Sequence, residues 1–155
     1  MSQTDARPEM AQHDTDEFLS QETLPHAAER ELKGQTVPGW RRQALCASVD
    51  PDAWFPEHGV GADTRVLRLC AECPVRRSCL ATALLGHDLG VWAGTTEPTR
   101  RQGHRMLRHD VPAVEVLDVL LDLAVRKATR SRRRGGNRWS GSIHEQIRSG
   151  AESAA

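Results

Sequence analysis

The stretch CAECPVRRSCLATAL (70–84) carries three of the four cysteines of the chain, and Cys46 precedes them. The full spacing is C-x23-C-x2-C-x5-C. Cys70 and Cys73 are separated by about one helical turn and can reach one metal centre together, whereas Cys79 follows one or two turns later. Cys46 must arrive across a long loop. In the reducing cytoplasm, where this chain is expected, clustered cysteines are more often metal ligands than structural disulfides. The pattern therefore predicts a metal centre.

The spacing alone leaves the metal open. Tetrahedral zinc and an iron–sulfur cluster both accept four thiolates, and zinc is the default choice from ligand chemistry. A structural zinc site usually pairs two C-x2-C motifs, however, and this chain has one. A disulfide pair and four unliganded thiols are weaker alternatives. The histidines are interpreted as ordinary surface residues without a ligand role: His58, His87, His104 and His109.

The residues around the cysteines add a second signal. Trp40 lies six positions before the first cysteine, DPDAWFPE (50–57) follows it, and GVWAGTT (90–96) comes after the last one. Together with the four cysteines, these segments resemble the WhiB-like (Wbl) family of bacterial transcription regulators over about residues 40–105. One position departs from the family turn, which usually has a third glycine where this chain has Ala93. If that position needs a positive φ, alanine costs about 1 kcal/mol there.

The resemblance implies an all-α fold, in which a small helical domain wraps around a [4Fe–4S] cluster held by Cys46, Cys70, Cys73 and Cys79. It also implies a regulator that responds to redox state or nitric oxide and binds the C-terminal domain of the primary sigma factor. The family positions that contact sigma factor match four aromatic residues here: Trp40, Trp54, Phe55 and Trp92.

Three regions are expected along the chain. Residues 1–39 form an acidic, mostly disordered arm, residues 40–105 the cysteine domain, and residues 106–155 an amphipathic helix with a basic tail. Pro, Gly and apolar spacing predict helices at 25–34, 63–69, 74–85 and 112–126. The last of these must pack on another element through an apolar stripe of Ala113, Val114, Leu117, Leu120, Leu121 and Ala124.

The net charge of zero hides an uneven distribution. Residues 1–39 hold eight acids and three bases, whereas residues 101–155 hold six acids and eleven bases. A basic end of this kind favours an anionic partner, and nucleic acid is the usual one. The predicted DNA-binding residues are the seven bases of segment 126–138: Arg126, Lys127, Arg130, Arg132, Arg133, Arg134 and Arg138.

Other classes fit the sequence less well. No apolar run is long enough for a membrane helix and the N-terminus lacks the layout of a signal peptide, so a cytoplasmic protein is expected. We expect no enzyme activity and no small-molecule substrate. The rival enzyme would be a thiol–disulfide oxidoreductase using Cys70 and Cys73, but its usual strand–helix alternation is missing. A third alternative is a zinc-stabilised adaptor.

Overall fold

The computed structural model describes residues 23–57 and 61–134, without the side chains of 131–134. This part of the chain contains α-helices, short 3-10 helices and no strand, apart from an isolated bridge between Trp92 and Thr95. The all-α prediction is therefore confirmed. The elements in order are α2 (His26–Gly34), η1 (Trp40–Gln43), η2 (Leu45–Ser48), η3 (Pro51–Trp54), α3 (Thr64–Glu72), α4 (Arg76–Gly86), α5 (Glu97–Arg108) and α6 (Ala113–Arg134).

Local sequence signals account for several helix starts. Asp63 caps α3, because its carboxylate accepts the backbone N–H of Arg65 at 2.8 Å. Pro25 precedes α2, and α5 begins after Thr96 with Pro98 in its first turn, where a missing N–H costs nothing. Helix α4 ends at Gly86, and the following residue, His87, takes the left-handed conformation with φ of 50°.

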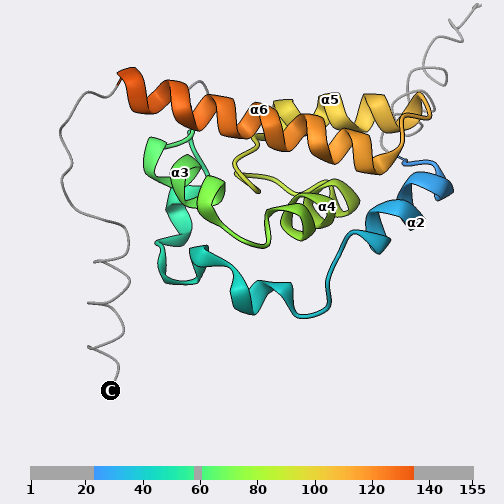
Figure 1. Ribbon diagram of the computed structural model, residues 1–155, viewed down its shortest axis with the longest axis horizontal. Helices are drawn as coiled ribbons and strands as arrows, with labels where there is room; N and C mark the ends of the chain where they lie inside the picture. The colour runs from blue at the N-terminus through green and yellow to red at the C-terminus, as the bar shows by residue number, and fades with distance from the viewer. Residues whose placement is uncertain (1–22, 58–60, 135–155) are drawn as a thin grey trace, which may run out of the picture.

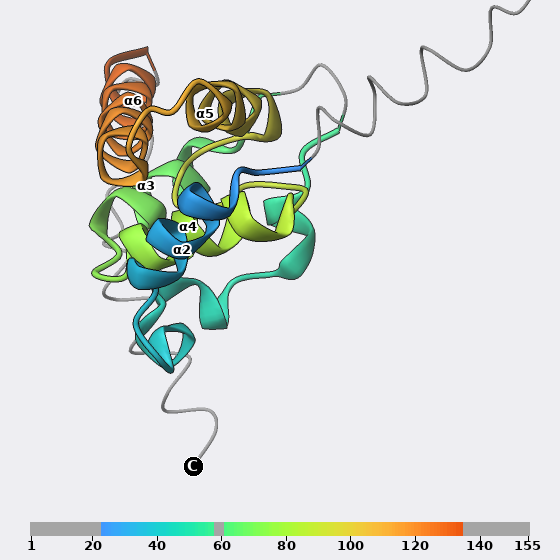
Figure 2. The same cartoon turned by 90° about the vertical axis from the view of Figure 1, so that its right-hand side faces the viewer.

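Helix α6 is the longest element and connects the others. It runs across one side of the molecule and contacts α2, α3, α4 and α5 (Figure 1). Turned by 90°, α5 and α6 lie side by side above the remaining helices (Figure 2). Two arginines of α4 bind α6. Arg76 donates to the Leu121 carbonyl at 3.0 Å, and Arg77 forms an ion pair with Asp118 at 2.7 Å.

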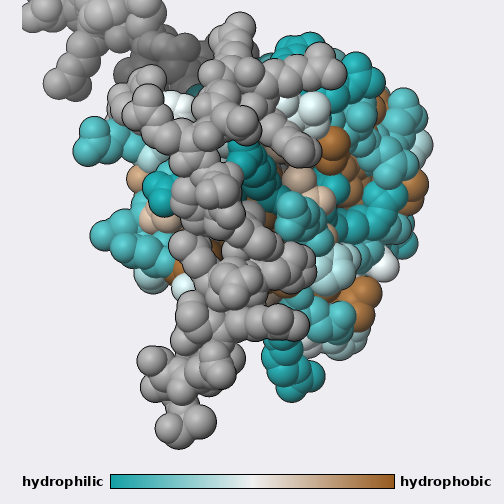
Figure 3. All heavy atoms as spheres, turned by 60° about the vertical axis from the view of Figure 1, so that its left-hand side comes forward, coloured by the Kyte–Doolittle hydropathy of each residue, from teal (hydrophilic) through white to brown (hydrophobic). Residues whose placement is uncertain are grey.

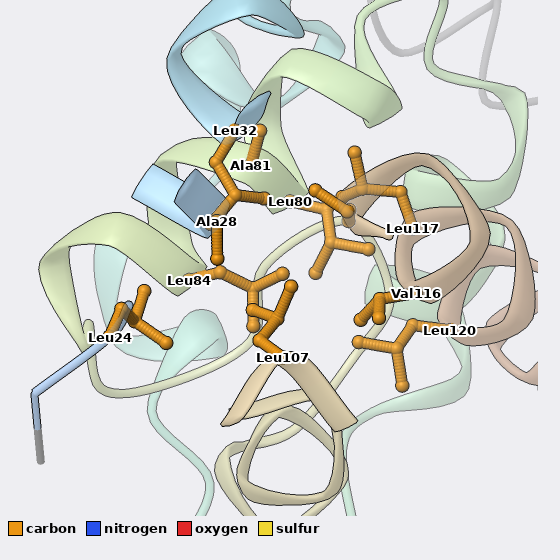
Figure 4. Packing of buried hydrophobic residues seen from close by; sticks show 12 residues of the cluster. Leu24, Ala28, Leu32, Leu80, Ala81, Leu84, Leu107, Val116, Leu117 and Leu120 are labelled. Atoms are coloured by element: carbon orange, nitrogen blue, oxygen red, sulfur yellow. The ribbon is translucent and has the colours of Figure 1, made fainter. Parts of the chain in front are cut away.

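The main hydrophobic core lies between α2, α4, α5 and α6. Leucines from all four helices point toward one another (Figure 4). The labelled residues of this core are Leu24, Ala28, Leu32, Leu80, Ala81, Leu84, Leu107, Val116, Leu117 and Leu120. A smaller cluster of Val66, Leu67, Val91 and Ala128 lies on the α3 side. Where described residues are visible in Figure 3, hydrophilic side chains alternate with small hydrophobic patches.

Several expectations about the periphery need correction. The arm predicted for residues 1–39 contributes Leu24, Ala28 and Leu32 to the core, because the amphipathic α2 buries one face on α4 and α6. The part of the arm before residue 23 lies outside the described residues. The segment after 126 is not a tail up to Arg134, since α6 continues through it.

Two further predictions about helices differ from the structure. Helix α5 was not predicted. In the α6 stripe, Val116 is buried, whereas Val114 is 45% exposed and Leu121 is only partly buried. The buried face of α6 is therefore rotated slightly about the helix axis relative to the predicted apolar stripe.

Candidate metal centre

All four cysteines line one cavity of about 400 Å³. The four aromatic residues predicted to contact a partner line the same cavity, together with aliphatic side chains that include Leu69, Leu89 and Val91. The structure thus brings Cys46, Cys70, Cys73 and Cys79 together, although Cys46 is remote from the others in sequence.

Four different local environments position these thiols. Cys46 lies in η2, Cys70 in the last turn of α3, and Cys73 directly after that helix, where its N–H donates to the Cys70 carbonyl at 3.3 Å. Cys79 lies in the first half of α4. Since α3 and α4 are fixed by packing on α6, the sulfurs of Cys70 and Cys79 are held by anchored helices. Cys73 follows the end of α3, and Cys46 is held by a short 3-10 turn.

Burial disfavours the thiolate form of three of the four cysteines: Cys46, Cys70 and Cys79. Burial raises the pKa of Cys70 and of Cys79 to about 12, and repulsion from the other sulfurs adds to the shift. Burial also raises the pKa of Cys46. Each cysteine of the set interacts electrostatically with the other three. A cation that replaces the protons removes this repulsion, so the site favours metal over free thiolates.

The turn at residues 90–95 forms one wall of the cavity. The backbone N–H of Gly94 donates to the Cys70 sulfur and that of Ala93 to the Cys79 sulfur. Gly90 has a φ of 77°, and a Cβ there would lie 2.7 Å from the Trp54 carbonyl oxygen, so only glycine fits. Ala93 also has a positive φ, of 51°, so the cost expected for alanine at this position applies.

A buried arginine that was not predicted from the sequence stabilises this turn by donating hydrogen bonds to its backbone carbonyls. Arg100 of α5 is 1% exposed. Its guanidinium donates to the carbonyls of Thr95 at 2.9 Å and Gly90 at 2.9 Å, and to that of Asp88. Burial lowers the pKa of this side chain. The only sequence signal was a basic residue shortly after the glycine turn, which does not distinguish a buried arginine from a surface one.

The four aromatic residues differ in exposure. Trp40 is 5% exposed and lines the cavity as part of its wall. The Arg41 guanidinium lies over its ring, 4.8 Å from the ring centre. Trp54 and Trp92 are partly buried, and the Trp92 indole N–H donates to the Leu89 carbonyl at 2.8 Å. Phe55 is 61% and Leu89 63% exposed. The open rim of the cavity is therefore apolar.

The donor set fits an anionic iron–sulfur cluster. Arg76 lines the cavity, lies close enough to Cys70 to lower its pKa, and has a buried Nε–H without an acceptor in the described part of the chain. Such an unpaired donor suits a negatively charged group. Within residues 23–57 and 61–134, no three Cys, His, Asp or Glu side chains are arranged to hold a single metal ion. A cluster differs because each cysteine binds its own iron.

The remaining predicted residues lie elsewhere. Arg126, Lys127 and Arg130 are exposed on α6; Arg132, Arg133 and Arg134 are in the same helix, with undescribed side chains, and Arg138 lies outside the described residues. The interpretation of four histidines as surface residues was wrong for one of them, His104. It is 8% exposed, stacks on His87 with ring centres 4.2 Å apart, and its Nε2 lies 2.9 Å from the Leu84 carbonyl. His58 is outside the described residues.

Comparison with known proteins finds sequence relatives of the segment that carries this site. Residues 40–102, which contain all four cysteines and the turn, match the family "Transcription factor WhiB". The chain is 46% identical over 68 residues to transcriptional regulator WhiB2 of Bifidobacterium longum, covering 43% of this chain and 67% of that protein. It is 39% identical over 85 residues to transcriptional regulator WhiB of Streptomyces coelicolor, covering 54% and 90%.

A third relative, transcriptional regulator WhiB2 of Mycobacterium tuberculosis, is 40% identical over 80 residues, which are 50% of this chain and 88% of that protein. The chain belongs to the WhiB family. Helices α2 and α6 lie entirely outside the matched segment, yet both pack against it. No helix in the described residues has the length and apolar character needed to cross a membrane.

Proposed function

We propose that this protein is a cytoplasmic transcriptional regulator that senses redox state or nitric oxide through a [4Fe–4S] cluster, and that it binds the primary sigma factor and DNA. The observation that carries the proposal is the convergence of four cysteines on one cavity with an apolar rim and an unpaired arginine donor. Its relatives are named transcriptional regulators, which supports the regulatory role.

In this proposal Cys46, Cys70, Cys73 and Cys79 hold the cluster, which supplies a redox-active and nitric-oxide-reactive group. The protein's own residues tune it. The N–H groups of Ala93 and Gly94 donate to two ligand sulfurs, and the Arg76 charge lies beside Cys70. Hydrogen bonds to sulfur and limited solvent access are the main means by which proteins adjust cluster potentials.

The thiol–disulfide oxidoreductase is disfavoured by the environment of its two cysteines. Reactive thiols have a lowered pKa, often at a helix N-terminus, whereas Cys70 lies in the last turn of α3, where burial outweighs the Arg76 charge and raises its pKa to about 12. The described residues also lack the strands of a thioredoxin-like unit. The zinc adaptor is disfavoured because the chain has one C-x2-C motif, whereas a structural zinc site usually pairs two.

The cluster is tested by iron and acid-labile sulfide analysis after anaerobic purification, with Cys46→Ser as the variant. We expect about four irons per wild-type chain and loss of stable cluster in the variant, because no other cysteine can replace the missing ligand. Ser48→Ala, at a neighbouring exposed position that does not line the cavity, is the control and should retain the cluster. Near-stoichiometric cluster in Cys46→Ser would remove Cys46 from the ligand set.

The sigma-factor contact is assigned to the rim of the cavity, because Phe55, Trp54 and Trp92 offer accessible aromatic surface and Trp40 offers almost none. Aromatic residues of this kind are frequent hot spots. Phe55→Ala and Trp92→Ala are each expected to cost about 2 kcal/mol or more of sigma-factor affinity, with the cluster spectrum and melting temperature close to wild type. If a variant loses its cluster yet its folded fraction still binds sigma factor normally, that residue is a packing residue.

A further inference from the structure

A second concave site lies on the other side of the turn, between α5 and the C-terminal half of α6. It has a volume of about 570 Å³. Its walls come from both helices and from the end of the turn: Gly94, Thr95, Thr99, Gln102, Leu123, Ala124, Arg126, Lys127 and Arg130. None of these residues belongs to the cysteine cavity, so the two sites are distinct.

The charges of this α5–α6 cleft have one sign. Three lining residues are basic and none is acidic. Arg126 is paired with Asp122 at 2.8 Å, whereas no carboxylate of the described residues lies in ion-pair range of Lys127 or Arg130. The amide of Gln102 adds a polar group from the opposite wall. Such a site attracts an anion, which the bases of α6 and the amide of Gln102 can contact from opposite walls.

We propose that the α5–α6 cleft binds backbone phosphates of duplex DNA. This inference rests on the proposed function and places its DNA contact on two packed helices. Helix α6 continues beyond the cleft, and Arg132, Arg133 and Arg134 belong to that continuation, so the basic part of the sequence extends past the cleft along one helix. No aromatic residue lines the cleft, which disfavours stacking on the bases of a nucleotide or a single strand.

The decisive substitution is Gln102→Glu, because it adds a negative charge to the cleft from α5, outside the basic segment of α6. Gln43→Glu is the matched control: it makes the same change at an exposed position of η1, below α4 and remote from α5 (Figure 1). Binding of the full chain to a fluorescent duplex is measured by anisotropy at several salt concentrations. We expect Gln102→Glu to weaken binding about tenfold, Gln43→Glu to change it less than about twofold, and Gln102→Lys to strengthen it.

The double variant Lys127→Gln/Arg130→Gln tests the phosphate contact itself. Each lost phosphate contact lowers the slope of log affinity against log salt by about 0.9, so the slope should fall by about 1.8. Arg101→Gln/Arg105→Gln removes two exposed bases of α5 that do not line the cleft and should change the slope much less.

The possible failures are distinguishable. If the wild type binds DNA but Gln102→Glu behaves like Gln43→Glu, the cleft inference is wrong while the DNA proposal stands. If the wild type does not bind DNA even at low salt, the DNA part of the proposed function fails as well. If Gln102→Glu weakens binding of inorganic phosphate or of RNA polymerase but leaves DNA affinity unchanged, the cleft serves a small anion or an acidic protein segment, and the inference is overturned.

Discussion

The two halves of this domain are held together by different forces. The half formed by α2, α4, α5 and α6 shares a cluster of fully buried leucines, alanines and a valine. The half that contains residues 40–57 and α3 consists largely of 3-10 helices around the cysteine cavity, and Trp40 is the only buried residue of 40–57. The difference indicates that hydrophobic burial stabilises the first half. Under the proposed function, ligation of the cysteines orders residues 40–57 of the second half, whereas α3 also packs on α6.

The largest effect on stability is expected in the hydrophobic half. Leu84 is fully buried between α2, α4, α5 and α6, so Leu84→Ala should lower the free energy of unfolding by about 3 to 5 kcal/mol. Urea denaturation measures this change. Val114→Ala on the exposed side of α6 is the control and should stay within about 0.5 kcal/mol of wild type. Equal effects of the two variants would show that this half is not tightly packed.

An intermediate effect is expected at the turn that joins the halves. Arg100→Met removes the donors to the carbonyls of Gly90 and Thr95 and leaves them unsatisfied in a buried region, so we expect a loss of about 2 to 3 kcal/mol. Arg105→Met on the exposed side of α5 is the control. In Arg100→Met, Trp92 fluorescence should shift before the helices unfold. A normal melt for this variant would contradict the role of Arg100.

The smallest effect concerns pH and lies at the edge of the hydrophobic half. Burial lowers the pKa of His104, its bond to the Leu84 carbonyl acts in the opposite direction, and the nearby positive charges of His87, Arg108 and Arg100 lower it further. The folded state therefore binds a proton less readily than the unfolded chain. Stability from this residue is complete above about pH 6.5 and is lost as pH falls below it.

The corresponding variant is His104→Gln, which keeps an N–H donor toward Leu84 without titrating. Urea midpoints between pH 7.5 and about 5 should fall less steeply for this variant than for wild type. His109→Gln, at an exposed position just after α5, should retain the wild-type dependence. Identical pH profiles for all three proteins would exclude His104 as the source.

Much of this architecture was predictable because the signals were local. Four helices were expected close to their observed positions, and the shared cavity of the four cysteines agrees with their predicted grouping. Helix α5 could not be found in this way. Its buried residues are Arg100, Gly103, His104 and Leu107, so its sequence shows no apolar stripe, and Pro98 and Gly103 resemble loop signals.

The end of α6 shows the same limitation. Its bases suggested a tail, but arginine has a good helix propensity, and Ala128 buries against Val66, Leu67 and Val91 of the other half. The α5–α6 cleft lies between these two elements, α5 and the C-terminal part of α6, neither of which was predicted correctly. The cleft requires α5, which the sequence pattern does not reveal, and the extension of α6, which was interpreted as a tail. The sequence therefore predicted DNA-binding bases without predicting a cleft between two helices.

The central claim, that metal ligation orders one half while packing holds the other, is tested most directly by hydrogen exchange with mass spectrometry on cluster-loaded and cluster-depleted protein. Removal of the cluster should abolish protection in residues 40–57 and weaken it in α3, while α4, α5 and α6 keep most of their protection. Uniform loss of protection over all helices, or no change in residues 40–57, would contradict the account.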